Sequence, residues 1–545
     1  QPVTHDTTLT ARWTRTDTQH WTISPAQGPE AGGTKLTLTP PARRGVRFSQ
    51  TSFGSFHSAG IGSDGQLYTW GNNSSGQLGD GTTSSRSTPV QIGKPQGAPA
   101  GFTWTQVSLG GFHSAAIGSD GQLYTWGYNN YGQLGNGTRR RTPTLVGKPQ
   151  GGPAGFTWKQ VSLGSSHSAA IGSDGNLYTW GYNNYGQLGD GTTTNRRAPV
   201  QIGKPQGAPD GFTWKQTSLG YQHSAAIGSD GNLYTWGRND YGQLGDNAGT
   251  TRYTPTLVGK PQGAPDGFTW KQTSLGSGHS AAIGSDGNLY TWGGNTYGQL
   301  GDGTTFNQNT PTLVGKPQGA AYGFFWKQTS LGNAYSVAIG SDGSLYTWGG
   351  NTYGQLGDGT TADQHTPTQV GKPQGAADGF TWKQTSLGEN HSAALGSDGS
   401  LYTWGYNGEG QLGREPSEAW PASRPGPVGF PGKPQATSIC FDQTRQQGAC
   451  LAAGKNLTPN PDGTWNATTP AYTPGPVPAA IDWTQDGRQQ QTDTSNTYRY
   501  LSIASLPLTG GNGMLLLLAT GLLAAGAAAA AKNRRQQTQT HTSHE

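Results

Sequence analysis

Short runs of apolar and β-branched residues, separated by Gly, Asp and Pro, recur through most of the chain. In one copy these runs occupy residues 211–220, 223–227, 233–237 and 254–259. Runs of this length, bounded by such residues, are typical of β-strands. The Ser-Asp-Gly between the second and third runs suits a tight hairpin. Because no segment of the unit has the length or period of a helix, the pattern predicts about four strands per unit.

The unit recurs at a nearly constant interval. Its copies begin at Gly45, Gly101, Gly155, Gly211, Gly267, Gly323 and Gly379. The tryptophans of the Tyr-Thr-Trp-Gly motif, spaced by 56, 54, 56, 56, 56 and 56 residues, are Trp70, Trp126, Trp180, Trp236, Trp292, Trp348 and Trp404. A four-stranded unit cannot bury both faces of its sheet alone, so it needs neighbours. Seven similar units without distinct caps favour a closed β-propeller over residues 45–435 rather than an open solenoid.

One block of the unit carries a family resemblance. The block Gly-x-Leu-Tyr-Thr-Trp-Gly-x-Asn-x-x-Gly-Gln-Leu-Gly resembles the repeat of the regulator of chromosome condensation family. The resemblance implies a seven-bladed propeller. The best-known member is a nuclear exchange factor for the small GTPase Ran, so the likeness also implies a guanine-nucleotide exchange factor-like regulator as an alternative function. Fold transfers more safely than activity from such a likeness.

The C-terminal segment, residues 503–545, contains a second motif. Leu506, Pro507, Leu508, Thr509 and Gly510 precede an apolar run at 514–531 and then a basic cluster at 532–535. The run is long enough to cross a hydrocarbon core as a transmembrane helix, with the basic cluster on the cytoplasmic side. This arrangement resembles the LPXTG sorting signal of Gram-positive cell-wall proteins. The resemblance implies that sortase cleaves after Thr509 and joins it to peptidoglycan; an ordinary membrane anchor is the alternative.

The remaining segments suggest export and a stalk. The chain begins at Gln1 without a leader, so we expect either a removed signal peptide or a fragment. Residues 436–502 resemble a small immunoglobulin-like β-sandwich, and residues 1–44 a truncated remnant of one or a strand added to the propeller. Cys440 and Cys450 are the two cysteines, and we expect them to form a disulfide across a short loop.

Most repeated polar residues suggest structure rather than chemistry. Tyr335 replaces a histidine that the other units share as His57, His113, His167, His223, His279 and His391. Equivalent side chains around a seven-membered ring lie too far apart to share one metal ion, so we expect hydrogen bonding, no metal and no cofactor. Catalysis requires unlike groups in one place, and we expect no enzyme. Glu409, Arg414 and Glu415 are the faint candidates for the alternative of a surface hydrolase.

Binding residues are sought where the copies differ. The loop after Gly-Gln-Leu-Gly carries arginines in the first four units: Arg86, Arg139, Arg140, Arg141, Arg196, Arg197 and Arg252. They predict a basic, anion-binding arc on one rim. Lysines repeat once per unit at Lys94, Lys148, Lys204, Lys260, Lys316, Lys372 and Lys433. Such a field would attract a sulfated glycan, a teichoic acid or extracellular nucleic acid. The net charge of +5 over 545 residues also fits solvated loops, and no specific nucleic-acid partner is expected.

A second variable patch precedes each histidine. Its residues mix aromatic and polar types: Ser55, Phe56, Gly111, Phe112, Tyr221, Gln222, Asn333, Ala334, Glu389 and Asn390. This composition suits an adaptable contact surface, although unconstrained loop drift would also produce it.

Together these patterns predict an all-β protein: a seven-bladed propeller, an immunoglobulin-like stalk and a C-terminal sorting helix. We expect a monomeric, secreted, non-catalytic adhesin, covalently anchored to the cell wall of a Gram-positive bacterium. Its expected partners are sortase, peptidoglycan, the membrane before sorting, and a host or cell-surface glycan or protein.

Overall fold

The computed structural model describes residues 21–39, 46–414, 422–428, 435–441, 453–460, 464–485, 488–489 and 493–502. The chain divides into two compact units, residues 44–431 and residues 1–43 with 432–545. Within the described ranges every regular element is a β-strand, and none is a helix that could span a membrane. The predicted sorting signal (506–510), the apolar run (514–531), Glu415, Lys433 and Cys450 lie outside those ranges. Cys440 is disulfide-bonded.

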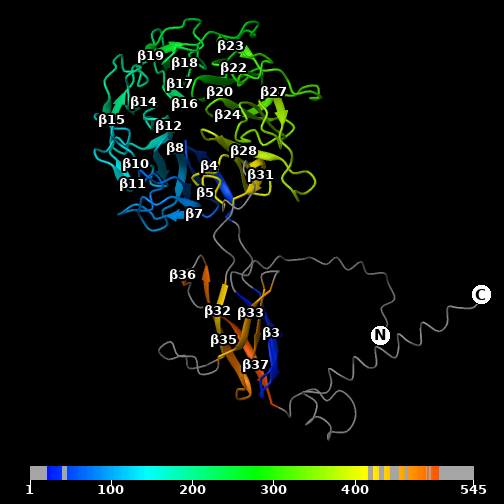
Figure 1. Cartoon of the computed structure of the whole chain (residues 1–545). Helices are drawn as coiled ribbons and strands as arrows, with labels where there is room; N and C mark the ends of the chain where they lie inside the picture. Colours follow the sequence, from blue (N-terminus) through cyan, green and yellow to red (C-terminus); the bar gives the residue numbers. More distant parts are fainter. Residues whose placement is uncertain are drawn as a thin grey trace, which may run out of the picture. The chain divides into compact units, whose positions relative to one another are not determined.

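The unit 44–431 is a β-propeller of seven antiparallel four-stranded blades, as the repeat predicts (Figure 1). Blade 1 consists of β4 (Phe48–Phe53), β5 (His57–Gly62), β6 (Leu67–Gly71) and β7 (Arg86–Ile92). Blade 2 consists of β8 (Trp104–Leu109), β9 (His113–Gly118), β10 (Leu123–Gly127) and β11 (Arg140–Val146), and blade 3 of β12 (Trp158–Leu163), β13 (His167–Gly172), β14 (Leu177–Gly181) and β15 (Arg196–Gln201). Blade 4 consists of β16 (Trp214–Leu219), β17 (His223–Gly228), β18 (Leu233–Gly237) and β19 (Arg252–Leu257). Blade 5 consists of β20 (Trp270–Leu275), β21 (His279–Gly284), β22 (Leu289–Gly293) and β23 (Gln308–Leu313). Blade 6 consists of β24 (Trp326–Leu331), β25 (Tyr335–Gly340), β26 (Leu345–Gly349) and β27 (Gln364–Gln369). Blade 7 consists of β28 (Trp382–Leu387), β29 (His391–Gly396), β30 (Leu401–Gly405) and β31 (Ala422–Pro427).

The hydrophobic core of the propeller lies between blades. The two middle strands of a blade, such as β17 and β18, are buried along their whole length, whereas the outermost strand, such as β19, is largely half-buried or exposed. One core cluster joins Ile227 and Leu233 of blade 4 to Trp270 and Trp292 of blade 5. Each seam is therefore filled by the aromatic residues that the repeat supplies once per blade.

The ring closes without an exchanged strand. Every blade is one continuous segment of chain, so blades 1 and 7 meet only through side-by-side contacts. At this closing seam Trp70 Nε1 donates to the carbonyl of Gln411 at 2.9 Å, a bond found at the other seams. One hydrogen bond of the other seams is missing at the closing seam. Between blades 1 and 2, Val107 N donates to Gln50 Oε1 at 3.0 Å. The equivalent atom at the closing seam, the buried Gln384 Oε1, has no hydrogen-bond partner in the described part of the chain.

The second unit contains two sheets. One has the order β1 (Thr22–Ser24), β3 (Lys35–Thr39), β34 (Trp465–Thr468) and β33 (Lys455–Pro459). The other has the order β2 (Gln27–Pro29), β37 (Asp493–Leu501), β35 (Gly475–Gln485) and β32 (Gln435–Phe441), with β36 (Arg488–Gln489) beside β35. Trp21 and Leu38 pack in one buried cluster with Phe441 and Tyr498.

The sequence interpretation treated residues 1–44 as separate from 436–502, and the structure differs. β3 pairs antiparallel with β34, and β2 pairs parallel with β37, so the N-terminal strands complete sheets built from the C-terminal segment. They add no strand to the propeller. Burial of Leu36 and Leu38 in the common core explains this pairing across the whole chain.

Candidate functional site

A belt of buried hydrogen bonds joins neighbouring blades at the repeated histidines. His57 Nε2 lies 2.9 Å from Ser114 Oγ of the next blade, and Ser114 Oγ donates to the carbonyl of Gln77 at 2.7 Å. Because the serine uses its only proton on Gln77, the histidine carries its proton on Nε2. Trp126 Nε1 donates to the same carbonyl at 2.9 Å. The motif thus locks each blade to the next.

The six histidines of this belt are uncharged at neutral pH. Each side chain is fully buried, and burial lowers the pKa of each to about 3. Their Nδ1 atoms have no hydrogen-bond partner among the described residues. In the seventh position the Tyr335 hydroxyl donates to the carbonyl of His391 at 2.7 Å, so an inter-blade bond persists without an imidazole. This geometry gives the histidines a structural role.

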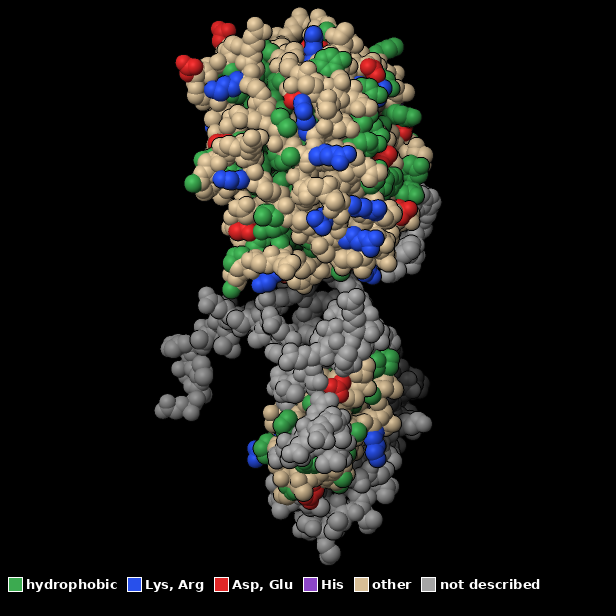
Figure 2. Space-filling view, turned by 90° about the vertical axis from the view of Figure 1, so that its left-hand side faces the viewer, with side chains coloured by type: hydrophobic (Ala, Val, Ile, Leu, Met, Phe, Trp, Pro, Cys, Tyr) green, Lys and Arg blue, Asp and Glu red, His purple; other side chains and the backbone are tan. Residues whose placement is uncertain are grey.

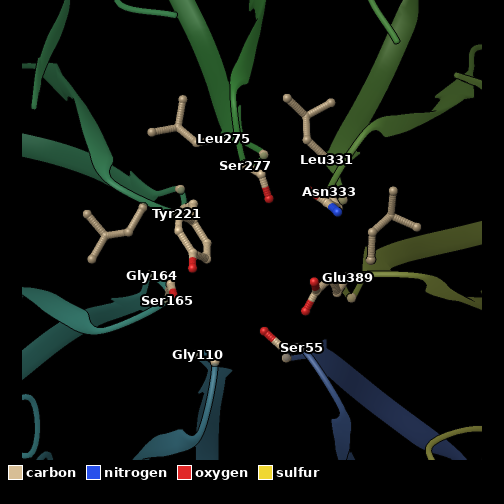
Figure 3. A pocket seen from close by; sticks show the side chains of 18 of the residues that line it. Ser55, Gly110, Gly164, Ser165, Tyr221, Leu275, Ser277, Leu331, Asn333 and Glu389 are labelled. Carbon is tan, nitrogen blue, oxygen red and sulfur yellow. The ribbon is translucent and has the colours of Figure 1, made fainter. Parts of the chain in front are cut away.

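The central channel narrows where the innermost strands end. Its narrow mouth is a cavity of about 100 Å³, lined by a Leu-Gly-x or Phe-Gly-x segment from every blade (Figure 3). Glycine is required before the variable residue, since a Cβ on Gly54 would lie 2.3 Å from the carbonyl oxygen of Gly110. The variable residues of these segments are Ser55, Gly111, Ser165, Tyr221, Ser277, Asn333 and Glu389. The structure therefore gathers the first residue of each pair in the second variable patch around the channel axis, whereas the second residue of each pair does not line this cavity.

Among the described residues that line the narrow mouth, Glu389 alone is charged. Its carboxylate lies beside Ser55, which hydrogen-bonds to it (Figure 3). Burial raises the pKa of Glu389 above its ordinary value. Hydroxyl groups, the Asn333 amide and the Tyr221 phenol complete a small polar ring suited to hydrogen bonding with a ligand.

Aromatic side chains surround the narrow mouth. The loops after the third strands lie against the loops after the first strands, since Tyr128 N donates to the carbonyl of Phe112 at 2.9 Å. We call the surface formed by these two sets of loops the loop face. Its ring contacts are Phe56 with Phe112 at 5.9 Å, Tyr131 with Tyr182 at 4.9 Å and Tyr353 with Tyr406 at 5.2 Å.

The loop face also carries a cation among its tyrosines. The Arg238 guanidinium lies 5.3 Å from the ring centre of Tyr185 and 5.8 Å from that of Tyr241. Tyr221 and Tyr241 are about half exposed, at 50% and 47%. Arg238 is half-buried and forms an ion pair with Asp240 at 2.7 Å. Tyrosine and arginine are among the residue types that dominate binding energy at protein interfaces.

Fewer arginines of the predicted basic arc are free to bind an anion than the seven that the sequence contains there. Arg86, Arg196 and Arg252 each form an ion pair with an aspartate of the same loop, at 2.9, 2.7 and 2.7 Å. Internal pairing cancels the charge of each of these three arginines. Arg139 donates to the backbone carbonyl of Ser74 at 2.8 Å in the preceding blade.

Arg140, Arg141 and Arg197 are exposed, and within the described ranges they form no ion pair. The local reason in blade 2 is Asn136, which replaces the aspartate of the paired loops. Figure 2 shows Lys and Arg side chains as separate groups on the side that carries β11 and β15.

Of the three residues of the hydrolase alternative, the structure describes Glu409 and Arg414, and these two have different partners. Glu409 Oε2 accepts a hydrogen bond from Asn72 Nδ2 at 2.8 Å, across the closing seam. The Arg414 side chain is buried and donates to the carbonyl of Thr403 at 3.0 Å. These contacts serve ring closure and the blade interior.

Sequence reasoning missed two sets of residues. The first set is the tyrosine that precedes Gly-Gln-Leu-Gly in five copies, where the other two copies have Ser75 and Glu409. The second set is the lysine of the Trp-Lys-Gln segment. Its presence in five copies and absence from two was the available signal.

Comparison with known proteins agrees with this architecture. The RCC1-like domain pattern matches residues 26–327, and the regulator of chromosome condensation (RCC1) repeat matches residues 342–395 and 398–440. The ultraviolet-B receptor UVR8 of Arabidopsis thaliana is 33% identical over 377 residues, which are 69% of this chain and 80% of UVR8. The human E3 ubiquitin-protein ligase HERC2 is 32% identical over 65% of this chain, which corresponds to 7% of HERC2.

Solved structures share the fold at lower identity. Human WBSCR16 superimposes with a TM-score of 0.57 at 23% identity, covering 66% of this chain and 89% of that one. Prp20p of Saccharomyces cerevisiae, described with its binding to Gsp1p and histones, gives 0.56 at 18% identity, covering 78% of this chain and 93% of that one.

Proposed function

The chain belongs to the RCC1-like propeller family, and on this premise we propose that it is a non-catalytic surface protein whose propeller binds a protein partner through the loop face. The observation that carries the proposal is the position of the differences between blades. Residues needed for the fold are nearly identical in all seven copies, whereas one set of variable residues, one from each blade, lies around the narrow mouth. Side chains at positions that the fold leaves free to vary can be adapted to bind a ligand.

The chemistry of the loop face favours a protein over other ligands. Tyr221, Tyr241 and Arg238 present rings and a guanidinium with little conformational freedom to lose, and such groups form the energetic centre of many protein interfaces. Prp20p, a structural relative, is described as binding Gsp1p and histones, which makes protein binding a reasonable expectation for a propeller of this fold.

We also propose that the protein is displayed on a Gram-positive cell wall. The support is the order of Leu506–Gly510, the apolar run and the basic cluster in the sequence. Expression of the full chain in a Gram-positive host, with and without sortase, tests this part. Release by muramidase from sortase-positive cells alone is expected, and recovery mainly from the cytosol would contradict it.

Binding is tested with substitutions that the chain already contains at equivalent positions. Tyr221→Ser introduces the residue of blades 1, 3 and 5, and Arg238→Gly introduces that of blades 5 and 6. Both are compatible with the blade fold. The purified chain is screened against extracellular-matrix proteins, and the double variant is expected to lose at least about tenfold in affinity. Lys215→Thr, at the opposite end of the channel, is the control. Protein binding by the loop face would be refuted if the double variant and the Lys215→Thr control lost affinity equally, or if the parent chain bound no protein of the screen.

A further inference from the structure

The propeller has a second mouth, at the end of the channel where the innermost strands begin. A cavity of about 1030 Å³ opens there across blades 5, 6 and 7 and reaches Ser49 of blade 1. Three lysines from consecutive blades line it, Lys271, Lys327 and Lys383. We call this cavity the wide mouth.

The lysines of the wide mouth belong to a larger arc. The second position of the innermost strand holds lysine in blades 3 to 7 and a small hydroxyl residue in blades 1 and 2: Ser49, Thr105, Lys159, Lys215, Lys271, Lys327 and Lys383. All seven side chains are exposed. Equivalent positions in successive blades follow one another around the axis, so five ammonium groups form an arc around this end of the channel.

The arc is not neutralised by ion pairs. Within the part of the propeller that the structure describes, none of the five lysines pairs with a carboxylate. Lys327 Nζ donates to the backbone carbonyl of Ser341 at 2.8 Å. The nearby Asp342 is held within its own hairpin, where it accepts hydrogen bonds from Tyr346 Oη at 2.8 Å and Ser344 N at 3.0 Å.

Blade 6 departs from the repeat at this mouth. Phe325 replaces the threonine of the other Gly-Phe-Thr-Trp copies, lines the wide mouth and is 45% exposed. Three residues earlier, the fully exposed Tyr322 replaces the aspartate that blades 4, 5 and 7 carry, and it lines an adjoining cavity that shares Ser341 and Asp342 with the wide mouth. Both changes add an aromatic surface, and the second also removes a negative charge. The wide mouth therefore brings ammonium groups and an aromatic ring together in one cavity.

We propose that the wide mouth binds an anionic polymer whose phosphate or sulfate groups are carried on sugar or polyol units. Several ammonium groups spread over an arc match repeated anions along a chain. A single tightly held phosphate would instead require a guanidinium fork or a nest of backbone N–H groups. Phe325 offers a flat apolar surface beside the lysines, suited to the carbon face of a sugar ring. This site lies in the channel and is separate from the arginine arc that the sequence predicted.

The site is tested on the full chain with two purified polymers, heparin and poly(glycerol phosphate). The triple variant Lys271→Thr, Lys327→Thr and Lys383→Thr introduces the residue of blade 2 at each position. The matched control is Arg140→Gln, Arg141→Asn and Arg197→Asn, which removes the same charge and uses residues native to blade 5. Thermal unfolding verifies that both variants fold.

We expect the lysine variant to bind the polymers at least about tenfold more weakly than the parent chain. The slope of log affinity against log salt concentration should become shallower by about 2 to 3. The arginine variant should change affinity less than about threefold. Phe325→Thr should weaken heparin more than poly(glycerol phosphate), which lacks sugar rings. Binding of heparin alone would identify a sulfated glycan, and binding of poly(glycerol phosphate) alone a phosphodiester polymer. Equal losses in both triple variants, or no binding of either polymer, would overturn the proposal.

Discussion

The buried histidine belt makes the stability of the propeller sensitive to mild acid. In the folded chain the six histidines have a pKa near 3, whereas the unfolded chain has the ordinary value of about 6.5. A lowered pKa in the folded state means that the unfolded state takes up protons first. The stabilising contribution is therefore complete above pH 6.5 and is lost as the pH falls from 6.5 towards 3.

The magnitude follows from the number of histidines. Between pH 7.5 and 5.5 each histidine lowers the free energy of unfolding by about 1.4 kcal/mol, so six lower it by about 8 kcal/mol. This loss is comparable to the whole stability of a typical domain, about 5–15 kcal/mol. Ordinary carboxylates titrate near pH 4, below this window. We expect denaturant unfolding, followed by tryptophan fluorescence, to show a steep loss of stability between pH 6.5 and 5.

His223→Gln isolates one member of the belt. The glutamine amide can donate to Ser280 Oγ, the present partner of His223 Nε2 at 3.0 Å, but it takes up no proton. The variant should be less stable than the parent at pH 8 by about 1 kcal/mol. Its loss per pH unit below 6.5 should be smaller by about 1.4 kcal/mol, so the two stability curves should cross. The exposed His365→Gln is the control for loss of an imidazole outside the belt. An unchanged slope in His223→Gln would refute the reasoning.

Other predictions concern the seams and the loops. Trp292→Ala should lower the free energy of unfolding by about 3–5 kcal/mol, because it empties a buried seam and removes one of two donors to the Gln243 carbonyl; a loss below about 1 kcal/mol would make this tryptophan peripheral. Gly245→Ala should cost about 2–4 kcal/mol, since its Cβ would lie 2.7 Å from Trp292 Nε1 at a φ of +69°, whereas Gly207→Ala, with a φ of +80° and open space, should cost only about 1–2 kcal/mol. Asp190→Asn should lower the free energy of unfolding by less than about 1 kcal/mol, because its Arg196 partner is partly exposed. Urea titrations measure the stability of all four variants. Nucleotide release from a small GTPase should not be accelerated by the chain, and acceleration would favour the exchange-factor alternative.

The propeller could be predicted from the sequence because its information is local and repeated. Strand runs such as 223–227 and the hairpin at 228–231 agree in every copy, so errors in one unit are corrected by the others. The pairing of β3 with β34 could not be predicted, since its partners lie more than 400 residues apart and leave no local signal.

The candidate sites were only partly predictable for a different reason. The variable residues around the narrow mouth were identified because copies differ there. The ion pair of Arg86 with Asp80 was readable in principle, since both residues occur in the same loop and Asn136 replaces the aspartate in blade 2. The lysine arc was missed because a residue present in five of seven copies resembles a fold requirement until the channel geometry is known.

The pairing of N-terminal and C-terminal strands in the second unit has a mechanical consequence. The chain leaves this unit after β3, builds the whole propeller and returns at β32, so the propeller is tethered by two covalent segments in parallel. A ligand that pulls on the propeller divides its force between both segments. A single tether would concentrate the same force on one terminal blade and peel the ring apart from the closing seam. Here both ends of the propeller segment lead back into the second unit, so the first and last blades stay connected through it for as long as β2 and β3 remain paired in their sheets.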